Sequence, residues 1–181
     1  GEIENLKREV AIHKQLTHPN IVHLVETYMD YPSVVDDEED DGRLESDKVL
    51  HIVMEYADFG SLQDKIRNRG QTRLPIEEVW DYVVQILAAV RYMHDNLVVH
   101  RDIKPLNVFL AGPGGRIVKV GDFGISVQLE SRNAQVYEAV GTPYYLSPEI
   151  CQETAYAWPS DIWSMGCILY EMCCSKVPFD A

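Results

Sequence analysis

The sequence predicts an α+β fold in two unequal parts joined by a short polar segment at residues 55–60. Three observations predict it. A helical pattern followed by two β-rich segments occupies residues 1–54, a long amphipathic helix lies in the middle of the chain, and an apolar helix lies near its C-terminus. Residues 61–181 are therefore expected to form a mostly helical second part.

The first part is predicted to contain one helix and a β-hairpin. Apolar residues recur among charges from Glu2 to Leu16, and Pro19 follows in the run that ends the helix. Apolar and polar residues alternate from Ile21 to Tyr28, and this segment is rich in residues that favour β-strands. The segment from Val49 to Met54 is predicted to be a second strand. We expect the two strands to pair as a hairpin with a long loop.

The second part is predicted to open with a short helix from Ser61 to Asn68, for which Ser61 is the N-cap. The long helix follows, with an apolar side made of Val79, Tyr82, Val83, Ile86, Leu87, Val90 and Met93. The turn Gly112–Gly115 connects strands at Val108–Ala111 and Ile117–Val120. The helix from Asp161 to Cys174 is apolar enough to be expected in the interior, with Trp163 in the core.

Charge is distributed unevenly along the chain. The 16 basic and 29 acidic residues give a net charge of −13, which argues against nucleic acid or an anionic membrane as the main partner. Nine acidic and two basic residues lie between Asp30 and Lys48, and we refer to residues 30–48 as the acidic insert. The insert is either a docking site for a basic partner or a solvated, disordered loop.

The cysteines and the longest apolar segment give information on the cellular compartment of the protein. The four cysteines form no C-x-x-C pair and have no histidine cluster beside them, which favours reduced thiols in a cytoplasmic or nuclear protein. The longest apolar run, Ile162 to Cys174, is too short to cross a bilayer.

The run from His100 to Asn107 reads His-Arg-Asp-Ile-Lys-Pro-Leu-Asn and carries the clearest chemistry. Asp102 could accept a hydrogen bond from a reacting hydroxyl, Lys104 could reach a transferring phosphoryl group, and Asn107 could ligate a metal ion. Asp122, in Asp-Phe-Gly, adds a second metal-binding side chain. Either motif alone is weak, but the two in order, with strands between them, indicate phosphoryl transfer.

These motifs and their flanks resemble a eukaryotic serine/threonine protein kinase domain, and more narrowly the NIMA-related kinase family. The segments that carry the resemblance are Gly121–Ile125, Gly141–Cys151, Ser160–Cys167 and Pro178–Phe179. The resemblance implies a two-lobed fold, ATP and Mg²⁺ as cofactors, and protein substrates with Ser or Thr. It also associates the chain with the cytoskeleton, centrosome or cilium.

The resemblance implies further roles for single residues. Glu9 matches the glutamate that pairs with the ATP-anchoring lysine, and Thr142 matches the threonine that bonds the catalytic aspartate and lysine. Asp161 would hold the backbone of the run from His100 to Asn107, which we call the catalytic loop. Glu149 would pair with an arginine further along the chain. The nucleotide would meet Met54 as gatekeeper, the backbone of Glu55 and Ala57, and Phe109 beneath the purine, with Asp122 on its metal.

Three positions depart from the family pattern. Glu138 stands where a phosphorylatable residue is common, and we predict that it pairs with Arg101 and partly replaces a phosphate. His13 stands in a normally apolar stack with Leu24, Phe123 and His100, where it either packs as a neutral ring or couples the stack to pH. Leu106 and Ser61 replace acids, which predicts no strong demand for Arg three residues before the phosphosite.

The resemblance begins at the helix that carries Glu9, so the chain is expected to be a piece of a kinase truncated at both ends. The glycine-rich loop and the lysine strand would precede it, and the isolated piece should bind ATP poorly. A catalytically inactive pseudokinase or scaffold is the alternative reading, although Asp102, Lys104, Asn107 and Asp122 favour an active parent. A small-molecule kinase would not need the Gly141–Cys151 segment.

Overall fold

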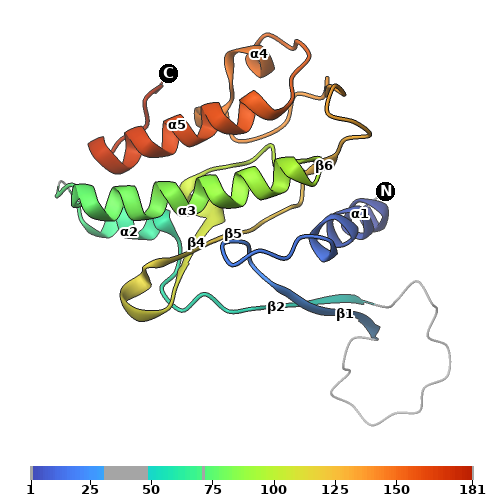
Figure 1. The fold of residues 1–181 in the computed structure, drawn as a ribbon, viewed down its shortest axis with the longest axis horizontal. Coiled ribbons are helices and arrows are strands. Elements are labelled where there is room, and N and C mark those ends of the chain that lie inside the picture. The colour runs from blue at the N-terminus through green and yellow to red at the C-terminus, as the bar shows by residue number, and fades with distance from the viewer. Residues whose placement is uncertain (1, 31–48, 71, 181) are drawn as a thin grey trace, which may run out of the picture.

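The structure is a computed structural model that describes residues 2–30, 49–70 and 72–180. The acidic insert, apart from Asp30, lies outside the described residues, so the docking prediction made for it remains a prediction. Figure 1 shows the long helices α3 (Ile76–Asp95) and α5 (Trp158–Cys174) side by side, with α1 (Glu2–Lys14) and the first two strands on the other side of α3.

The predicted hairpin is confirmed, with a correction to its first strand. β1 (Leu24–Asp30) pairs antiparallel with β2 (Val49–Met54). The strand was predicted to begin at Ile21, but Ile21 forms a parallel bridge with Val120 instead. Val22 donates its N–H to the Val120 carbonyl at 2.8 Å, so this backbone joins the first part of the chain to the second before the hairpin begins.

Most local predictions for the second part are confirmed. Ser61 caps α2 (Leu62–Asn68) through a capping box with Asp64, because each residue bonds the backbone of the other. The remaining elements are β3 (Val98–Val99), β4 (Val108–Ala111), β5 (Ile117–Val120), β6 (Val127–Gln128), α4 (Pro148–Cys151), and the short helices η2 (Pro105–Asn107), η3 (Pro113–Gly115) and η4 (Pro143–Tyr145). β4 pairs with β5 and β3 with β6, both antiparallel.

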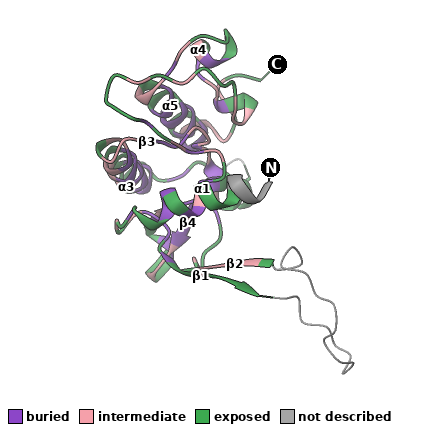
Figure 2. Cartoon of the chain, turned by 90° about the vertical axis from the view of Figure 1, so that its right-hand side faces the viewer, coloured by how far each residue is buried: buried purple, intermediate pink, exposed green. Residues whose placement is uncertain are grey.

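The core lies between α3, α5 and β4, whereas the hairpin is mostly exposed or half-buried (Figure 2). The predicted apolar side of α3 is buried except for Leu87, which is exposed. Its position at the margin of the apolar stripe explains why helical periodicity alone placed it inside.

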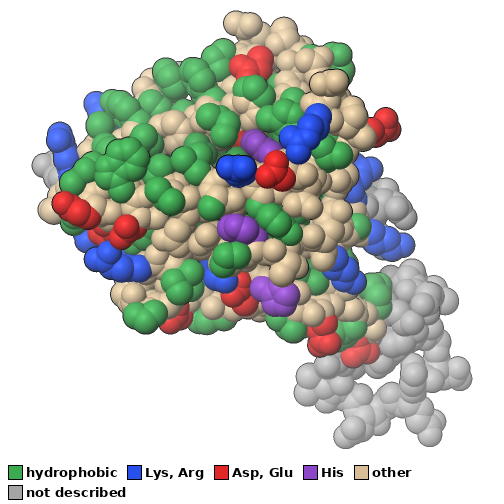
Figure 3. Space-filling view, in the orientation of Figure 1, with side chains coloured by type: hydrophobic (Ala, Val, Ile, Leu, Met, Phe, Trp, Pro, Cys, Tyr) green, Lys and Arg blue, Asp and Glu red, His purple; other side chains and the backbone are tan. Residues whose placement is uncertain are grey.

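The prediction that α5 is buried and that Trp163 lies in the core is wrong. The helix begins earlier than predicted, at Trp158, and buries one face while Ile162, Trp163 and Tyr170 are exposed. Trp163 stacks on Phe179 at a centroid distance of 5.6 Å. Figure 3 shows hydrophobic side chains gathered on the face of the molecule that carries α5. Among the described residues, no helix combines the length and apolar character that a bilayer crossing needs.

Candidate active site

Asp102 lies at the centre of a hydrogen-bond network made by the predicted catalytic residues. Lys104 Nζ donates to Asp102 Oδ2 at 2.6 Å and to Thr142 Oγ1 at 2.8 Å, and Thr142 Oγ1 donates to Asp102 Oδ1 at 2.7 Å. Asn107 Nδ2 donates to the Asp102 carbonyl and to Asp102 Oδ2, both at 3.0 Å. The network fixes the orientation of the carboxylate before any substrate arrives.

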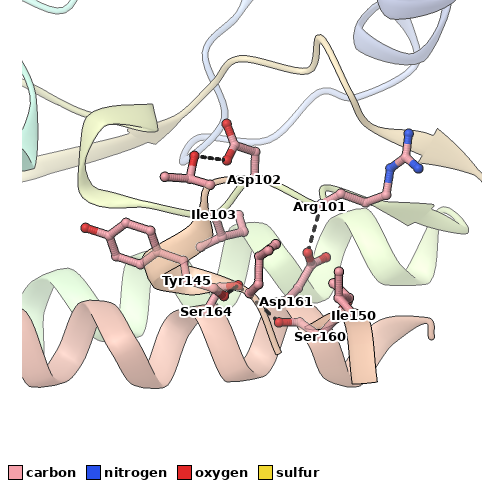
Figure 4. A pocket seen from close by; sticks show the side chains of 10 residues that line it. Arg101, Asp102, Ile103, Tyr145, Ile150, Ser160, Asp161 and Ser164 are labelled. Atoms are coloured by element: carbon pink, nitrogen blue, oxygen red, sulfur yellow. Dashed lines mark hydrogen bonds between the residues drawn. The ribbon is translucent and has the colours of Figure 1, made fainter. Parts of the chain in front are cut away.

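Asp161, from the first turn of α5, holds the backbone beside this network. Its carboxylate accepts the N–H groups of His100 and Arg101, both at 3.0 Å, and lies 2.8 Å from His94 Nε2. Figure 4 shows the Asp161 side chain pointing toward Arg101, below Asp102. The contact predicted for Asp161 is therefore present, whereas nothing in the sequence pattern pointed to His94 as its third partner.

The predicted nucleotide-binding residues, although spread along the chain, line one cleft of about 650 Å³. These residues are Met54, Glu55, Ala57, Phe109 and Asp122, and Glu9, which was predicted to pair with the ATP-anchoring lysine, lines the same cleft. Phe109 is placed there by backbone pairing, because Ser61 bridges to Phe109 and Leu110 donates to the Gly60 carbonyl at 2.8 Å. A cleft of this size is suited to a nucleotide.

The connection at residues 55–60 presents specific backbone groups to the cleft. The Glu55 N–H donates to the His23 carbonyl at 2.9 Å, so the Glu55 carbonyl is the group left for a ligand. The Glu55 carboxylate turns away to Lys119, 2.9 Å from its Nζ, and to the His23 N–H at 2.6 Å. These two contacts hold the Glu55 side chain in place. A fixed side chain suits a residue that would bind a base through its backbone.

Negative charge gathers at the end of the cleft that would hold the phosphates. Burial raises the pKa of Glu9, and the nearby Asp122 carboxylate raises it further. Asp122 has a positive φ of 65° and accepts the Gly124 N–H at 3.3 Å. Two carboxylates this close favour a cation between or beside them.

The donor set suits a metal that is held jointly with phosphates. Asn107 uses its amide nitrogen toward Asp102, which leaves its amide oxygen to ligate a cation, and Asp122 supplies a carboxylate. In the described part of the chain, no group of three His, Cys, Asp or Glu side chains could hold a metal. One carboxylate and one amide match Mg²⁺, which is bound by few protein ligands together with water and phosphate oxygens.

Three of the four residues of the predicted stack, His13, Phe123 and His100, are buried rings, with Phe123 close to both of the others. The His13 and Phe123 rings lie 4.6 Å apart and the His100 and Phe123 rings 5.2 Å apart. His13 Nε2 lies 2.6 Å from the Val22 carbonyl, so this nitrogen is the donor. Burial lowers the pKa of His13 and the bond to Val22 only partly offsets it, which favours a neutral packed ring.

The predicted pair of Glu138 and Arg101 is present, with Arg101 Nη1 2.9 Å from Glu138 Oε2. Sequence reasoning missed the third member of this group, Tyr156, whose hydroxyl donates to the Glu138 carbonyl at 2.6 Å. No local signal marks Tyr156, because it lies in an irregular segment well separated from Glu138 along the chain.

A second hollow, of about 260 Å³, is lined by Lys104 and Thr142. Leu106 lines both hollows, and Arg67 of α2 lines the second one, which sequence reasoning did not single out. Ser61 faces the cleft with its hydroxyl bonded to Asp64. Glu149 lines a separate hollow beside Trp163 and Phe179, and its pairing with an arginine remains a prediction.

Comparison with known proteins supports the same interpretation over the full chain. The chain is 38% identical over 179 residues to human serine/threonine-protein kinase Nek5, covering 99% of this chain and 23% of that protein. It is 39% identical over 180 residues to mouse Nek1, covering 99% and 14%, and 38% identical over 181 residues to mouse Nek3, covering 100% and 32%. The chain thus spans about a third or less of the length of these relatives. The family model for the protein kinase domain matches residues 1–181, which include both the cleft and the Asp102 network. The chain therefore belongs to the protein kinase family.

Proposed function

We propose that the protein to which this chain belongs transfers the γ-phosphoryl group of ATP to Ser or Thr hydroxyls of protein substrates. The observation that carries the proposal is the Asp102 network, in which Lys104 and Thr142 bond the same carboxylate. A carboxylate held this way can orient an incoming hydroxyl, and the ammonium beside it can stabilise charge on the transferring phosphoryl group.

Each residue has a distinct task in this reaction. Asp102 accepts the hydrogen bond of the substrate hydroxyl and takes its proton as the oxygen attacks the γ-phosphorus, while the bond from that phosphorus to the β,γ-bridging oxygen breaks and ADP leaves. Lys104 neutralises charge that develops on the phosphoryl oxygens. Thr142 bonds both Lys104 and Asp102 and so fixes their relative position. Asn107 and Asp122 would hold Mg²⁺, which neutralises phosphate charge when bound.

The cleft provides the complementary binding surface for the nucleotide. The Glu55 carbonyl and the Ala57 backbone would bond adenine, Phe109 would lie under the purine, and Met54 would limit the depth of the cleft. Glu9 would pair with an ATP-anchoring lysine. Burial and the Asp122 carboxylate raise the pKa of Glu9, and a cation paired with Glu9 would lower it.

The second hollow supports a proposal about substrate preference. Leu106 lines both hollows, and Ser61, which faces the cleft, is bonded to Asp64. Neither Leu106 nor Ser61 offers a substrate Arg the carboxylate that basic-directed kinases commonly carry at these two positions. We expect no strong requirement for Arg three residues before the phosphosite, and a peptide array dominated by that Arg would refute this.

The four cysteines are free, which supports a cytoplasmic location. Association with the cytoskeleton, centrosome or cilium, and docking of a basic partner on the acidic insert, extend the proposal through family resemblance alone.

The catalytic proposal is tested with the full-length protein, purified and supplied with Mg²⁺ and γ-labelled ATP. Asp102→Asn should lower kcat by about 100-fold or more, because general-base and positioning roles contribute on this scale, while thermal stability changes little. Asp95→Asn, which removes the charge from two exposed ion pairs, with Arg91 and with Arg132, is the matched control and should keep full activity. Absence of label on Ser or Thr with the wild-type protein, or full activity in Asp102→Asn, would refute the proposal.

A further inference from the structure

The side chain of Arg101 connects the catalytic loop to the segment between Asp122 and Glu149, which we call the activation segment. Arg101 immediately precedes Asp102, and its side chain is only 7% exposed. Its Nε donates to the Ile125 carbonyl, near the start of the activation segment. Its Nη1 lies 2.9 Å from Glu138 Oε2, in the middle of that segment. One guanidinium therefore joins two distant points of the activation segment to the residue before Asp102.

The backbone around Glu138 is held in place independently of this ion pair. Val136 and Tyr156 exchange both backbone hydrogen bonds, at 2.8 and 2.9 Å. The buried Tyr156 hydroxyl also donates to the Glu138 carbonyl at 2.6 Å. Because this clamp orders the backbone, the Glu138 carboxylate loses little further freedom when it binds Arg101.

Glutamate at position 138 supplies an acidic side chain without any modification of the chain. A buried guanidinium needs an anionic or hydrogen-bonding partner, and in many kinases a phosphorylated residue provides it and orders the activation segment. Glu138 carries its single negative charge without any modification, and its carboxylate is planar, as guanidinium pairing favours. The Arg101 backbone N–H is in turn fixed on Asp161 at 3.0 Å, so the pair acts on a loop that is already anchored.

We infer that Glu138 is a positioning residue that orders the activation segment through Arg101, so that the kinase is active without phosphorylation of that segment. Glu138 acts through Arg101, next to Asp102, and lines neither the cleft nor the second hollow. The inference rests on the proposed kinase function and adds to it the means by which the active arrangement is maintained.

The first test compares activity before and after dephosphorylation. Full-length protein is treated with a Ser/Thr phosphatase until mass spectrometry finds no phosphate in the activation segment, and kcat is then measured with Mg²⁺ and ATP. Wild-type protein should keep its kcat. A loss of activity on dephosphorylation would overturn the inference.

The second test removes the charge at position 138. Glu138→Gln should lower kcat about fivefold to tenfold, the scale expected for one charge-assisted hydrogen bond, with little change in the KM for ATP. Glu138→Asp keeps the charge and should recover part of the loss, whereas Glu130→Gln, at another exposed glutamate of the segment, should match wild type. Because Glu138 is 68% exposed, the fold should tolerate these changes.

A double-mutant cycle shows whether the effect passes through Arg101. The losses of Arg101→Gln and Glu138→Gln should not add in the double variant, because either change alone breaks the same pair. Full activity in Glu138→Gln, or additive losses, would overturn the inference while the proposed function stands. A wild-type protein without any kinase activity would overturn both.

Discussion

Gly141 occupies a position where a side chain would press on the catalytic loop. Its φ is +125°, and a Cβ there would lie 2.7 Å from the Arg101 carbonyl oxygen and 2.8 Å from Leu146 Cδ2. The Arg101 carbonyl is backbone immediately before Asp102, so it cannot yield without moving the catalytic carboxylate. Glycine at this point lets the activation segment approach the loop closely enough for Thr142 to reach Asp102.

We therefore expect Gly141→Ala to lower kcat about tenfold or more and to destabilise the fold by about 1–3 kcal/mol, since strain and overlap act together. Kinase assays and thermal denaturation would measure the two effects. Gly114→Ala is the matched control, because Gly114 also has a positive φ, of +70°, but a Cβ there would meet nothing within 4 Å. Equal behaviour of the two variants would show that the approach to Arg101 does not matter.

A second prediction at the residue scale concerns His13 and the dependence of folding stability on pH. Burial lowers its pKa from the ordinary 6.5, so between 6.5 and the folded value the unfolded chain binds more protons than the folded one. Stability is therefore retained above pH 6.5 and is lost as the pH falls through the folded pKa. The electrostatic interaction with His23 lowers the pKa of His13 further, and the hydrogen bond to the Val22 carbonyl opposes the shift.

His13→Leu should be less stable at pH 7 by about 1–2 kcal/mol, because the Val22 carbonyl loses its partner, and this deficit should shrink as the pH falls from 7 to 5 because the variant loses stability less steeply. Denaturant unfolding across this range would measure the slope. Some slope should remain, because burial also lowers the pKa of His100. His51→Leu, on the hairpin, should keep the wild-type slope, and an unchanged slope in His13→Leu would exclude a role for His13 in the pH response.

At the scale of elements, α5 supports the catalytic loop through one residue. Asp161 is 1% exposed and accepts two backbone N–H groups of the loop. Asp161→Asn replaces one acceptor oxygen with an amide group, which would face a backbone N–H or His94. We expect a loss of about 1–3 kcal/mol in unfolding free energy for the buried bond that is broken, and a lower kcat because Asp102 follows the displaced loop.

Thermal denaturation and kinase assays on Asp161→Asn would check both parts. Asp81→Asn on α3 is the control: its ion pair with Arg116 joins side chains that are half-exposed or more, and such pairs contribute little. A stable but inactive Asp161→Asn protein would instead indicate that the carboxylate orients the loop without contributing to folding.

At the scale of the whole molecule, the cleft is assembled from both parts of the chain. Glu9 comes from α1 and Asp122 from beyond β5, and the two parts are also joined by the backbone bond from Val22 to Val120. A nucleotide bound there contacts both parts, so its binding free energy adds to the stability of the whole fold.

For the full-length protein we expect ATP with Mg²⁺ to stabilise the domain by about 2.7 kcal/mol at 100 times the Kd, seen as a rise in Tm. Removal of Mg²⁺ with EDTA should reduce the rise, because Asp122 and the phosphates would then repel. In Asp122→Asn the difference between Mg²⁺ and EDTA should shrink, whereas Asp81→Asn should behave like wild type. An identical rise with and without Mg²⁺ would argue against the proposed metal ligands.

Local features of this protein were predictable because their determinants are close together in the chain. The spacing of Asp102, Lys104 and Asn107 within one short loop indicates the proposed catalytic residues, and the capping box at Ser61 and the turn at Gly112–Gly115 depend on neighbours. The match of β4 and β5 to their predicted bounds has the same cause.

Contacts between segments that are distant in the chain could not all be predicted from the sequence pattern. The pairing of Glu138 with Arg101 could be predicted from family register, but the clamp by Tyr156 could not, because no periodicity links residues so far apart. The sequence by itself determined which chemical groups the catalytic loop carries. Tertiary packing decided that Tyr156 holds Glu138, that Glu9 and Asp122 share one cleft, and that Trp163 faces outward, because these outcomes depend on which helix faces and loops meet.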